Sequence, residues 1–466
     1  MSHQDPTNPP PVSRRARLLR QEGAIEVTLR RGTRLSPRVE FEPPGPPAGE
    51  VFQHLVVDLG DREESLGPCR LEREAGEPGH GRLVFLDQVY DADALVEAGR
   101  VVDLGAFFQN LPMVLGQKEH VRREFRDFVA DALYDLSVFK KFFDEQDRIF
   151  AGEPADVAAA AQAVVHRVEG PRFFAHIDAH LAGLDEQVRD FTLEEHERHG
   201  FYLRRQGWSV ILSSAFIKRS NLKPRGYAGD AEMMRMIYEN RPMGRYLFNQ
   251  LVHLHPVSHP GAEAVRSRRR LVPAALREVL ASRPAAEPFR VFSVAAGPAW
   301  ELRDVFRTVA DARRIEAVLL DQDPEALNLA RDGVASLEAE LGHPLRVQYV
   351  EDSVRTMLRG RGLAERIGRF DFIYSMGLFD YLTPPVARAV LSRLFDLLLP
   401  GGVIVVGNYH ARNPSRLYME YWLDWRLYHR TEATFLELAE GLPACRREVT
   451  FDATGCQMFL TLERAS

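Results

Sequence analysis

Two strand-like runs in the last two-fifths of the 466-residue chain end in side chains that could bind a nucleotide. The first run, FRVFSV, leads into Ala-Ala-Gly at 295–297, whose small side chains let a ligand approach the backbone. The second, RIEAVLLD, ends at Asp321, roughly 20 to 25 residues further on, where a carboxylate suits the two hydroxyls of a ribose. Asp323 precedes Pro324 and is expected to cap the next helix. The predicted ligand contacts in these loops are Ser293, Ala295, Ala296, Gly297, Asp321 and Gln322.

The elements that must position these loops alternate in type from about Phe289 onward. Five apolar, strand-length runs are separated by helical sequence, which predicts parallel strands buried on both faces. The last segment, CRREVTFDATGCQMFLTLER, predicts two strands joined at ATGC. Ligands of open α/β sheets bind beyond the carboxyl ends of the strands. Further candidates therefore follow the third, fourth and fifth runs: Asp352 and Ser353, Met376 and Gly377, and Asn408, Tyr409 and His410.

A doubly wound sheet closed by a hairpin resembles class I S-adenosylmethionine (SAM)-dependent methyltransferases. The segment YSMGLFDYL at 374–382 resembles the loop that these enzymes place beneath the methionine half of the cofactor, and PGG at 400–402 is another common feature. The resemblance implies SAM as cofactor, with Asp352 near the adenine amino group. The first loop departs from the pattern, because Ser293 stands at the usual acidic position and only Gly297 remains of the glycines.

Two further segments carry a narrower resemblance. NLKPRGYAGDAEMM at 221–234 and GNYHARNPSRLYMEYWLDW at 407–425 resemble the bacterial methyltransferase family of 3-hydroxypalmitic acid methyl ester biosynthesis, a quorum-signal synthase group. This resemblance runs from about Arg122 to the C-terminus and implies methyl transfer to a fatty-acid carboxylate. The glycine-rich segment predicts a loop between helices that could close over the cofactor. Its Tyr227 would face the site, and Arg225 or Asp230 would lie near the cofactor, although Asp230 could equally cap the next helix.

The residues expected to act in transfer are His410, Tyr227 and Arg416, with Tyr381, Tyr409 and Asn408 contacting the substrate. A carboxylate acceptor is already ionised at neutral pH and needs only orientation. A hydroxyl acceptor would need a base, for which His410 is the first choice. Two other functions stay open: methylation of another natural-product oxygen or nitrogen, and a non-catalytic regulatory role.

The remaining sequence predicts two more regions and a tail. Residues 1–15 are polar and proline-rich and predict a disordered tail, and 16–117 read as a small β-barrel-like domain. Residues 118–284 are almost wholly helical and would cover the site in 285–466. The motifs RRGTR at 30–34 and DREESLG at 61–67 resemble the PilZ domain. Asp61 and Ser65 are one residue too far apart for its second motif, which makes cyclic di-GMP binding doubtful and a structural or dimerising role preferable.

Composition bounds the function further. The net charge is −6, and no basic stripe favours nucleic acid. No apolar run is long enough for a membrane span, and no secretory signal begins the chain, so a cytoplasmic protein with a small-molecule substrate is expected. No metal site is predicted, because no cysteine or carboxylate completes the set His253, His255 and His259, whose flanking prolines favour a loop. Trp422 and Trp425 are expected on one helix, packed in the core or lining an acyl pocket.

Overall fold

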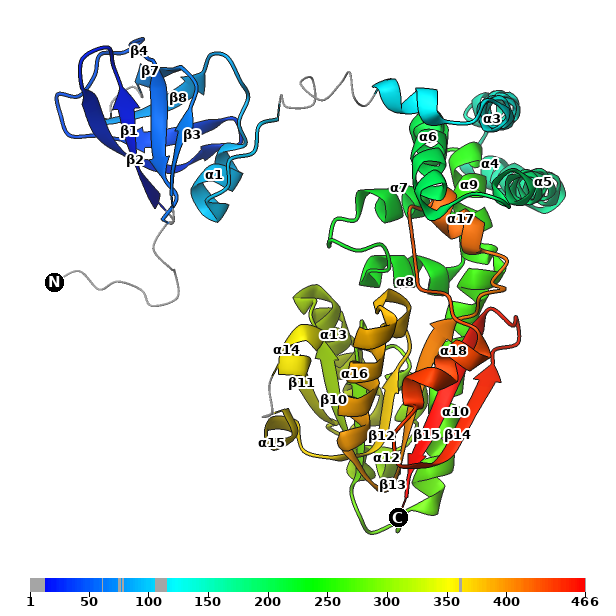
Figure 1. The fold of residues 1–466 in the computed structure, drawn as a ribbon. Coiled ribbons are helices and arrows are strands. Elements are labelled where there is room, and N and C mark those ends of the chain that lie inside the picture. Colours follow the sequence, from blue (N-terminus) through cyan, green and yellow to red (C-terminus); the bar gives the residue numbers. More distant parts are fainter. Residues whose placement is uncertain are drawn as a thin grey trace. The chain divides into compact units, whose positions relative to one another are not determined.

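The computed structural model describes residues 13–60, 62–73, 77, 79–104, 115–359 and 363–465. They fold as two compact units, Met1–His120 and Val121–Ser466, coloured blue to cyan and cyan to red in Figure 1. The predicted tail lies outside the described residues up to position 12, but residues 13–15 begin the first strand. The helical region and the α/β region, separated in the sequence analysis, form a single unit.

In its described residues, the N-terminal unit has a curled antiparallel sheet and the α-helix α1 (Ala92–Ala98). Its order is β4-β7-β8-β3-β2-β1-β5-β6. β4 and β5 are separated only by Gln53 yet stand near opposite ends of this order, so the sheet must curl back on itself like a barrel. The strands are β1 Ser13–Leu19, β2 Ala24–Thr33, β3 Ser36–Glu40, β4 Val51–Phe52, β5 His54–Asp58, β6 Glu63–Leu66, β7 Cys69–Arg73 and β8 His80–Phe85.

The helical part of the second unit is held together by buried aromatic and aliphatic side chains, including Phe125, Phe143, Phe173 and Phe248. Its last helix, α10, is shared with the α/β part: Val265 belongs to the helical core, and Leu276 packs against the sheet. That sharing explains why the two regions form one unit. The helices are α3 Arg123–Phe150, α4 Ala155–Val168, α5 Gly170–Val188, α6 Leu193–Ile211, α7 Ala215–Leu222, α8 Ala231–Glu239, α9 Leu247–Ser258 and α10 Pro260–Ser282.

The α/β part is a seven-stranded sheet of order β11-β10-β9-β12-β13-β15-β14. All neighbours pair in parallel except β15, which is antiparallel to both β13 and β14. This is the predicted doubly wound sheet closed by a hairpin, a Rossmann-like arrangement, with the order reversing between β9 and β12. The strands are β9 Phe289–Val294, β10 Ile315–Asp321, β11 Arg346–Glu351, β12 Phe370–Ser375, β13 Leu398–Tyr409, β14 Ala444–Phe451 and β15 Gln457–Arg464.

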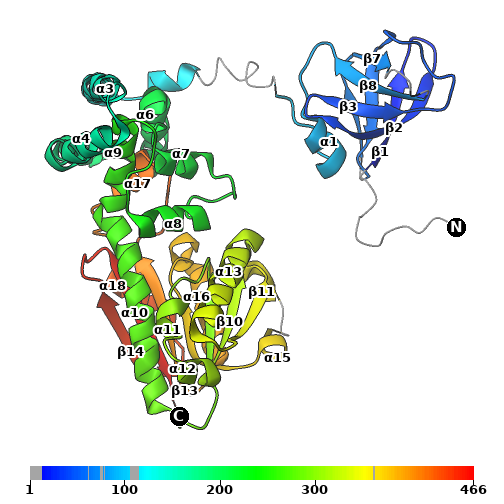
Figure 2. The same cartoon turned by 180° about the vertical axis from the view of Figure 1, so that it is seen from behind.

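Helices cover both faces of this sheet, as Figures 1 and 2 show from opposite sides. One core gathers α16 against Phe292 and Ile373, and the other gathers α10 and α13 against Val291 and Phe372. Every residue of β12 is therefore buried. The helices of this part are α11 Leu302–Val305, α12 Val309–Arg314, α13 Pro324–Leu341, α14 Val354–Arg359, α15 Leu363–Ile367, α16 Pro384–Asp396, α17 Arg416–Tyr421 and α18 Glu432–Leu436.

Two local predictions are wrong. The histidine segment 253–259 is not a loop: α9 continues through Pro256 to Ser258, because proline removes only one helical hydrogen bond near a helix end. Trp425 does not continue the helix that precedes it, because α17 ends at Tyr421 and the chain turns through Asp424 at a positive φ of 49°. Among the described helices, none is long and apolar enough to cross a membrane.

Candidate functional site

A cavity of about 800 Å³ opens at the carboxyl ends of the parallel strands, where the strand order reverses. This is within the roughly 300–1,000 Å³ of small-molecule sites. The loop before α8, together with α8 and α10, covers the strand ends. The predicted site residues that line the cavity are Tyr227, Ser293, Ala295, Ala296, Gly297, Asp321, Gln322, Asp352, Ser353, Met376, Gly377, Tyr381 and Tyr409.

The loop after β9 takes the conformation of a glycine-rich turn although it contains one glycine. Ala295, Gly297 and Ala299 stand two residues apart and have φ of 53°, 57° and 49°. The left-handed region is uncommon for a residue with a side chain, and such backbone clusters at functional sites. Apart from Gly297 and its two chain neighbours, no described residue has an atom within 4 Å of the position that a Cβ on Gly297 would occupy, so the space above this turn is open. The turn therefore forms even though alanines stand where the usual methyltransferase pattern has glycines.

Asp321 fixes this turn to the second strand. One carboxylate oxygen accepts a hydrogen bond of 2.7 Å from the Gly297 N–H, and the other accepts one of 2.9 Å from the Asp323 N–H. Burial raises the pKa of Asp321 above its ordinary value, against the lowering effect of these backbone donors. A carboxylate has lone pairs for about four hydrogen bonds, so Asp321 can still accept from a ligand in the cavity.

The predicted loop between α7 and α8 is present, but two of its charged residues serve the protein itself. Arg225 pairs with Asp323, and its Nη1 lies 2.9 Å from Glu325 Oε1. Asp230 caps α8 by accepting from the Met233 N–H. It also lies 2.8 Å from Arg219, which engages its carboxylate. Neither Arg225 nor Asp230 is among the described residues that line the cavity. Their ion pairs hold the loop against α7 and α13.

The same loop supplies one wall of the cavity. Tyr227 packs edge-on against Tyr381, with ring centroids 6.5 Å apart. The Tyr381 hydroxyl accepts a hydrogen bond of 2.8 Å from Trp425 Nε1. Gly229 fits between them, since a Cβ there would lie 2.5 Å from the Tyr381 hydroxyl and 2.8 Å from the Trp425 ring. Burial raises the pKa of both tyrosines well above the ordinary value, so they stay neutral donors.

The end of β11 offers a second carboxylate. Asp352 lines the cavity, accepts from the Ser353 N–H at 2.8 Å, and pairs with Arg366 at 2.6 Å. Its backbone N–H donates to the Asp321 carbonyl oxygen. The Ser353 hydroxyl accepts from the Thr356 N–H in the first turn of α14. The Ser353 hydroxyl, more than the Asp352 carboxylate, therefore caps the start of α14.

A cation that sequence analysis missed lies against the end of β12. Arg268 of α10 donates to the Met376 carbonyl oxygen at 2.9 Å, and its guanidinium lies beside Gly377. Within the described part of the chain, no carboxylate forms an ion pair with it. Tyr374 donates to Glu301 at 2.6 Å nearby, and burial raises the pKa of Glu301. Arg268 is one of four arginines in the run RSRRR. Only the direction in which its side chain leaves the helix separates it from the others, and the sequence does not show that direction.

The residues predicted at and after the end of β13 do not all reach the cavity. Tyr409 lines the cavity, whereas Asn408, His410 and Arg416 are not among its described lining residues. Consecutive side chains of extended backbone point to opposite sides, so Tyr409 faces the cavity and its two neighbours face away. Asn408 is buried and donates to the Tyr428 carbonyl oxygen. His410 lies 3.0 Å from Glu432, and Arg416 lies 2.8 Å from Glu420.

One carboxyl group with a strongly shifted pKa also lines the cavity. Burial raises the pKa of Asp380 to about 6, while the Tyr409 N–H, which donates to it at 2.7 Å, and the charges of Arg268 and Arg430 oppose the shift. Arg430 is itself buried and donates to the carbonyl oxygens of Phe379 and Leu382. These hydrogen bonds from Arg430 hold the backbone of the segment 379–382, which contains Asp380, in place.

No protein-family model matches the sequence, and no curated protein matches it. Solved structures with similar folds include a possible exported protein from Bordetella parapertussis, at 19% identity and a TM-score of 0.40, over 63% of this chain and 97% of that one. Another is magnesium protoporphyrin IX methyltransferase from Synechocystis PCC 6803 with bound SAH, at 11% identity and a TM-score of 0.33, over 43% and 85%. A third is the N-methyltransferase NodS from Bradyrhizobium japonicum WM9 with SAH, at 13% identity and a TM-score of 0.30, over 42% and 87%. Each similarity covers only part of this chain, and none assigns it a substrate.

We expect Gly229→Ala to destabilise the second unit by about 1 to 3 kcal/mol, because the added methyl group must displace Tyr381 or Trp425. Urea unfolding followed by tryptophan emission measures this selectively, since all four tryptophans lie in the second unit. Gly333→Ala on the exposed side of α13 is the control and should be neutral or stabilising by up to about 1 kcal/mol. Equal midpoints for the two variants would show that the loop has room at position 229.

Proposed function

We propose that the chain is a SAM-dependent methyltransferase. The observation that carries the proposal is the pairing of Asp321 with the Gly297 N–H at the strand-order reversal, beneath an open cavity. Asp321 retains acceptor capacity toward the ribose hydroxyls. The open space above Gly297 leaves the backbone of the turn accessible to a ligand.

The other strand ends extend this site in both directions. Asp352 and Ser353 would accept from or donate to the adenine ring, as the sequence resemblance implies. At the opposite end, Arg268 next to Met376 and Gly377 would pair with the methionine carboxylate. When bound, SAM supplies a methyl group on a positively charged sulfur, which an acceptor attacks in line. The chain's task is therefore alignment and exclusion of water.

We propose a carboxylate of a fatty or 3-hydroxy fatty acid as the acceptor. Apolar side chains Leu382, Val386 and Leu427 line the cavity beside Trp425, and they would cover an aliphatic chain. The neutral hydroxyl of Tyr227 is a candidate to orient the carboxylate. The Tyr409 hydroxyl already donates to the Gly261 carbonyl oxygen at 2.7 Å, so Tyr409 would contact the acceptor through its ring. An ionised carboxylate needs no base, which agrees with the position of His410 away from the cavity.

A second candidate is methylation of a hydroxyl or amine of another small molecule. Asp380 favours it, because a carboxyl group with a pKa near 6 in the cavity could remove a proton at neutral pH. The two candidates differ in pH dependence. Turnover of a hydroxyl acceptor should rise with pH through about 6, whereas turnover of a carboxylate acceptor should not depend on Asp380 in this way.

For the N-terminal unit we propose a structural role. The two arginines of the PilZ-like motif are engaged within the unit: Arg30 lies 2.5 Å from Glu40, and Arg34 lies 3.0 Å from Asp91. Both cations would have to leave these carboxylates to bind a cyclic dinucleotide. This engagement supports the reading in which the unit holds no such ligand.

Asp321→Ala should raise the Kd for SAM by about tenfold or more, because a charge-assisted hydrogen bond to the ribose is lost. Calorimetric titration of the full chain measures it directly. Asp332→Ala removes an exposed carboxylate from α13 and should leave the affinity unchanged. If both variants bind SAM like the unsubstituted chain, Asp321 is not the ribose ligand. If neither the variants nor the unsubstituted chain binds SAM, the result favours a non-catalytic regulatory role.

Arg268→Gln should also weaken SAM binding by about tenfold, since the amide retains hydrogen bonding but not the charge. Arg268→Lys keeps the charge and should lose less. The comparison of Kd for SAM with KM for the acceptor decides the assignment. A normal Kd with a raised KM would place the guanidinium against the acceptor and contradict the methionine assignment.

An acceptor screen tests the substrate class. We expect mass spectrometry to detect methyl esters after incubation of the chain and SAM with a pool of fatty and 3-hydroxy fatty acids, and to rank chain lengths. A host-cell metabolite extract runs in parallel. A methylated product in the extract alone would keep the enzyme class and reject fatty acids.

A further inference from the structure

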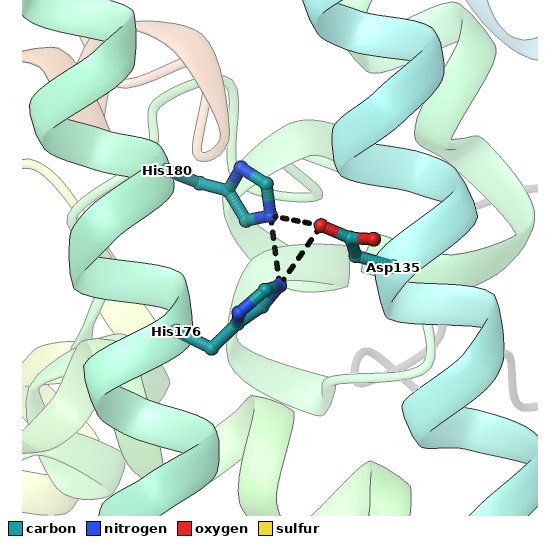
Figure 3. Close-up of side chains that lie close together, drawn as sticks. All are labelled: Asp135, His176 and His180. Carbon is teal, nitrogen blue, oxygen red and sulfur yellow. Dashed lines mark hydrogen bonds and ion pairs between the residues drawn. The ribbon is translucent and has the colours of Figure 1, made fainter.

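We propose that Asp135, His176 and His180 form a binding site for one divalent transition-metal ion between α3 and α5. His176 and His180 stand one turn apart on α5, and Asp135 faces them from α3, as Figure 3 shows. Residues four apart share a helix face, so the two imidazoles converge on one point. The site belongs to the helical part of the second unit and is independent of the residues proposed for SAM.

The three ligand atoms are spaced as a metal ion requires. His176 Nε2 lies 3.2 Å from Asp135 Oδ2, His180 Nε2 lies 3.3 Å from the same oxygen, and the two nitrogens are 3.0 Å apart. A tetrahedral ion with bonds of about 2.0–2.1 Å has ligand-to-ligand edges of about 3.3–3.4 Å. The triangle is therefore only slightly smaller than one face of such a tetrahedron. A small outward rotation of the rings admits the ion.

Hydrogen bonding alone satisfies this triangle poorly. If both Nε2 atoms are protonated, two N–H groups crowd each other at 3.0 Å as they donate to one oxygen. If only one is protonated, the lone pair of the other nitrogen faces the carboxylate oxygen across 3.2 or 3.3 Å. A cation accepts all three lone pairs at once, which removes the repulsion.

The surroundings suit an ion that enters from solvent. The side chains of His176, His180 and Asp135 are 32%, 17% and 38% exposed, so remaining coordination positions can hold water. Among the described residues, no lysine or arginine forms an ion pair with Asp135, and the Asp131 carboxylate adds negative charge near His180. Phe139 and Phe128 pack on the two imidazoles and hold their rings.

The donor set selects the class of ion. Two imidazoles and one carboxylate suit Zn²⁺, Co²⁺, Ni²⁺ or Fe²⁺, whereas Ca²⁺ and Mg²⁺ prefer oxygen ligands only. The histidines weighed in the sequence analysis contrast with this arrangement. His255 is bonded to Tyr418 and Asp178, and His253 is buried without a hydrogen-bond partner among the described groups. A bound ion would clamp α3 to α5.

The test uses the full chain without a histidine tag, freed of metal with a chelator and titrated with Zn²⁺ by calorimetry. We expect one site per chain with a Kd of about 1 μM or tighter. His176→Gln, His180→Gln and Asp135→Asn should each weaken binding by at least about tenfold. His343→Gln removes a histidine outside the cluster and should change nothing.

Two further readouts keep the outcome decisive if a variant folds poorly. Co²⁺ should give the visible absorption of a four- or five-coordinate site in the unsubstituted chain. Zn²⁺ should raise its Tm but not that of His180→Gln. Binding that is equal in all variants, or that shows several weak sites and an octahedral Co²⁺ spectrum, would mean adventitious binding and overturn the proposal. A normal zinc site without SAM binding would leave this proposal intact and defeat the methyltransferase one.

Discussion

The contact on which the site depends is the carboxylate of Asp321 held by the backbone of the neighbouring turn. It joins the end of β10 to the Gly297 N–H and, through the Asp323 N–H, to the start of α13. Two alanines in this turn adopt left-handed backbone. Such backbone persists only where the surroundings determine it, and this hydrogen bond is one such determinant. The shape of the cavity floor therefore depends on contacts between the strand ends and does not require a glycine-rich turn.

The cover of the cavity depends on the same strand end. Arg225 reaches from the loop before α8 to Asp323 and Glu325 at the first turn of α13. A carboxylate at a helix N-terminus is stabilised by the helix, and here it also receives the guanidinium. The loop that carries Tyr227 and Gly229 is thus tied to the sheet next to Asp321. Floor and cover share one electrostatic junction, which adds to the apolar packing of α10 in joining the helical and α/β regions.

Much of this architecture could be predicted because parallel strands and helices have distinct periods. Strand ends then place residues such as Asp321, Asp352 and Gly377 at one edge. Side-chain direction is less accessible to such reasoning. His410 and Tyr409 are adjacent in sequence, and only the strand's rotation decides that Tyr409 faces the cavity. Arg225 and Asp230 carry ligand-like charge, but their partners Asp323 and Arg219 are visible only in three dimensions.

Long-range pairing explains the residues that sequence analysis missed. Arg268 is one of several arginines in a row, and its value comes from lying beside Met376 and Gly377, more than 100 positions away in sequence. Asp135 is an unremarked acid on α3 until α5 brings two imidazoles to it. Arg268 and Asp135 are each a charged residue on a helix whose contacts lie on an element distant in sequence. In this chain the residues at the ends of the sheet strands could be predicted from the sequence. Arg268 and Asp135 could not, because their neighbours are brought to them by helix packing.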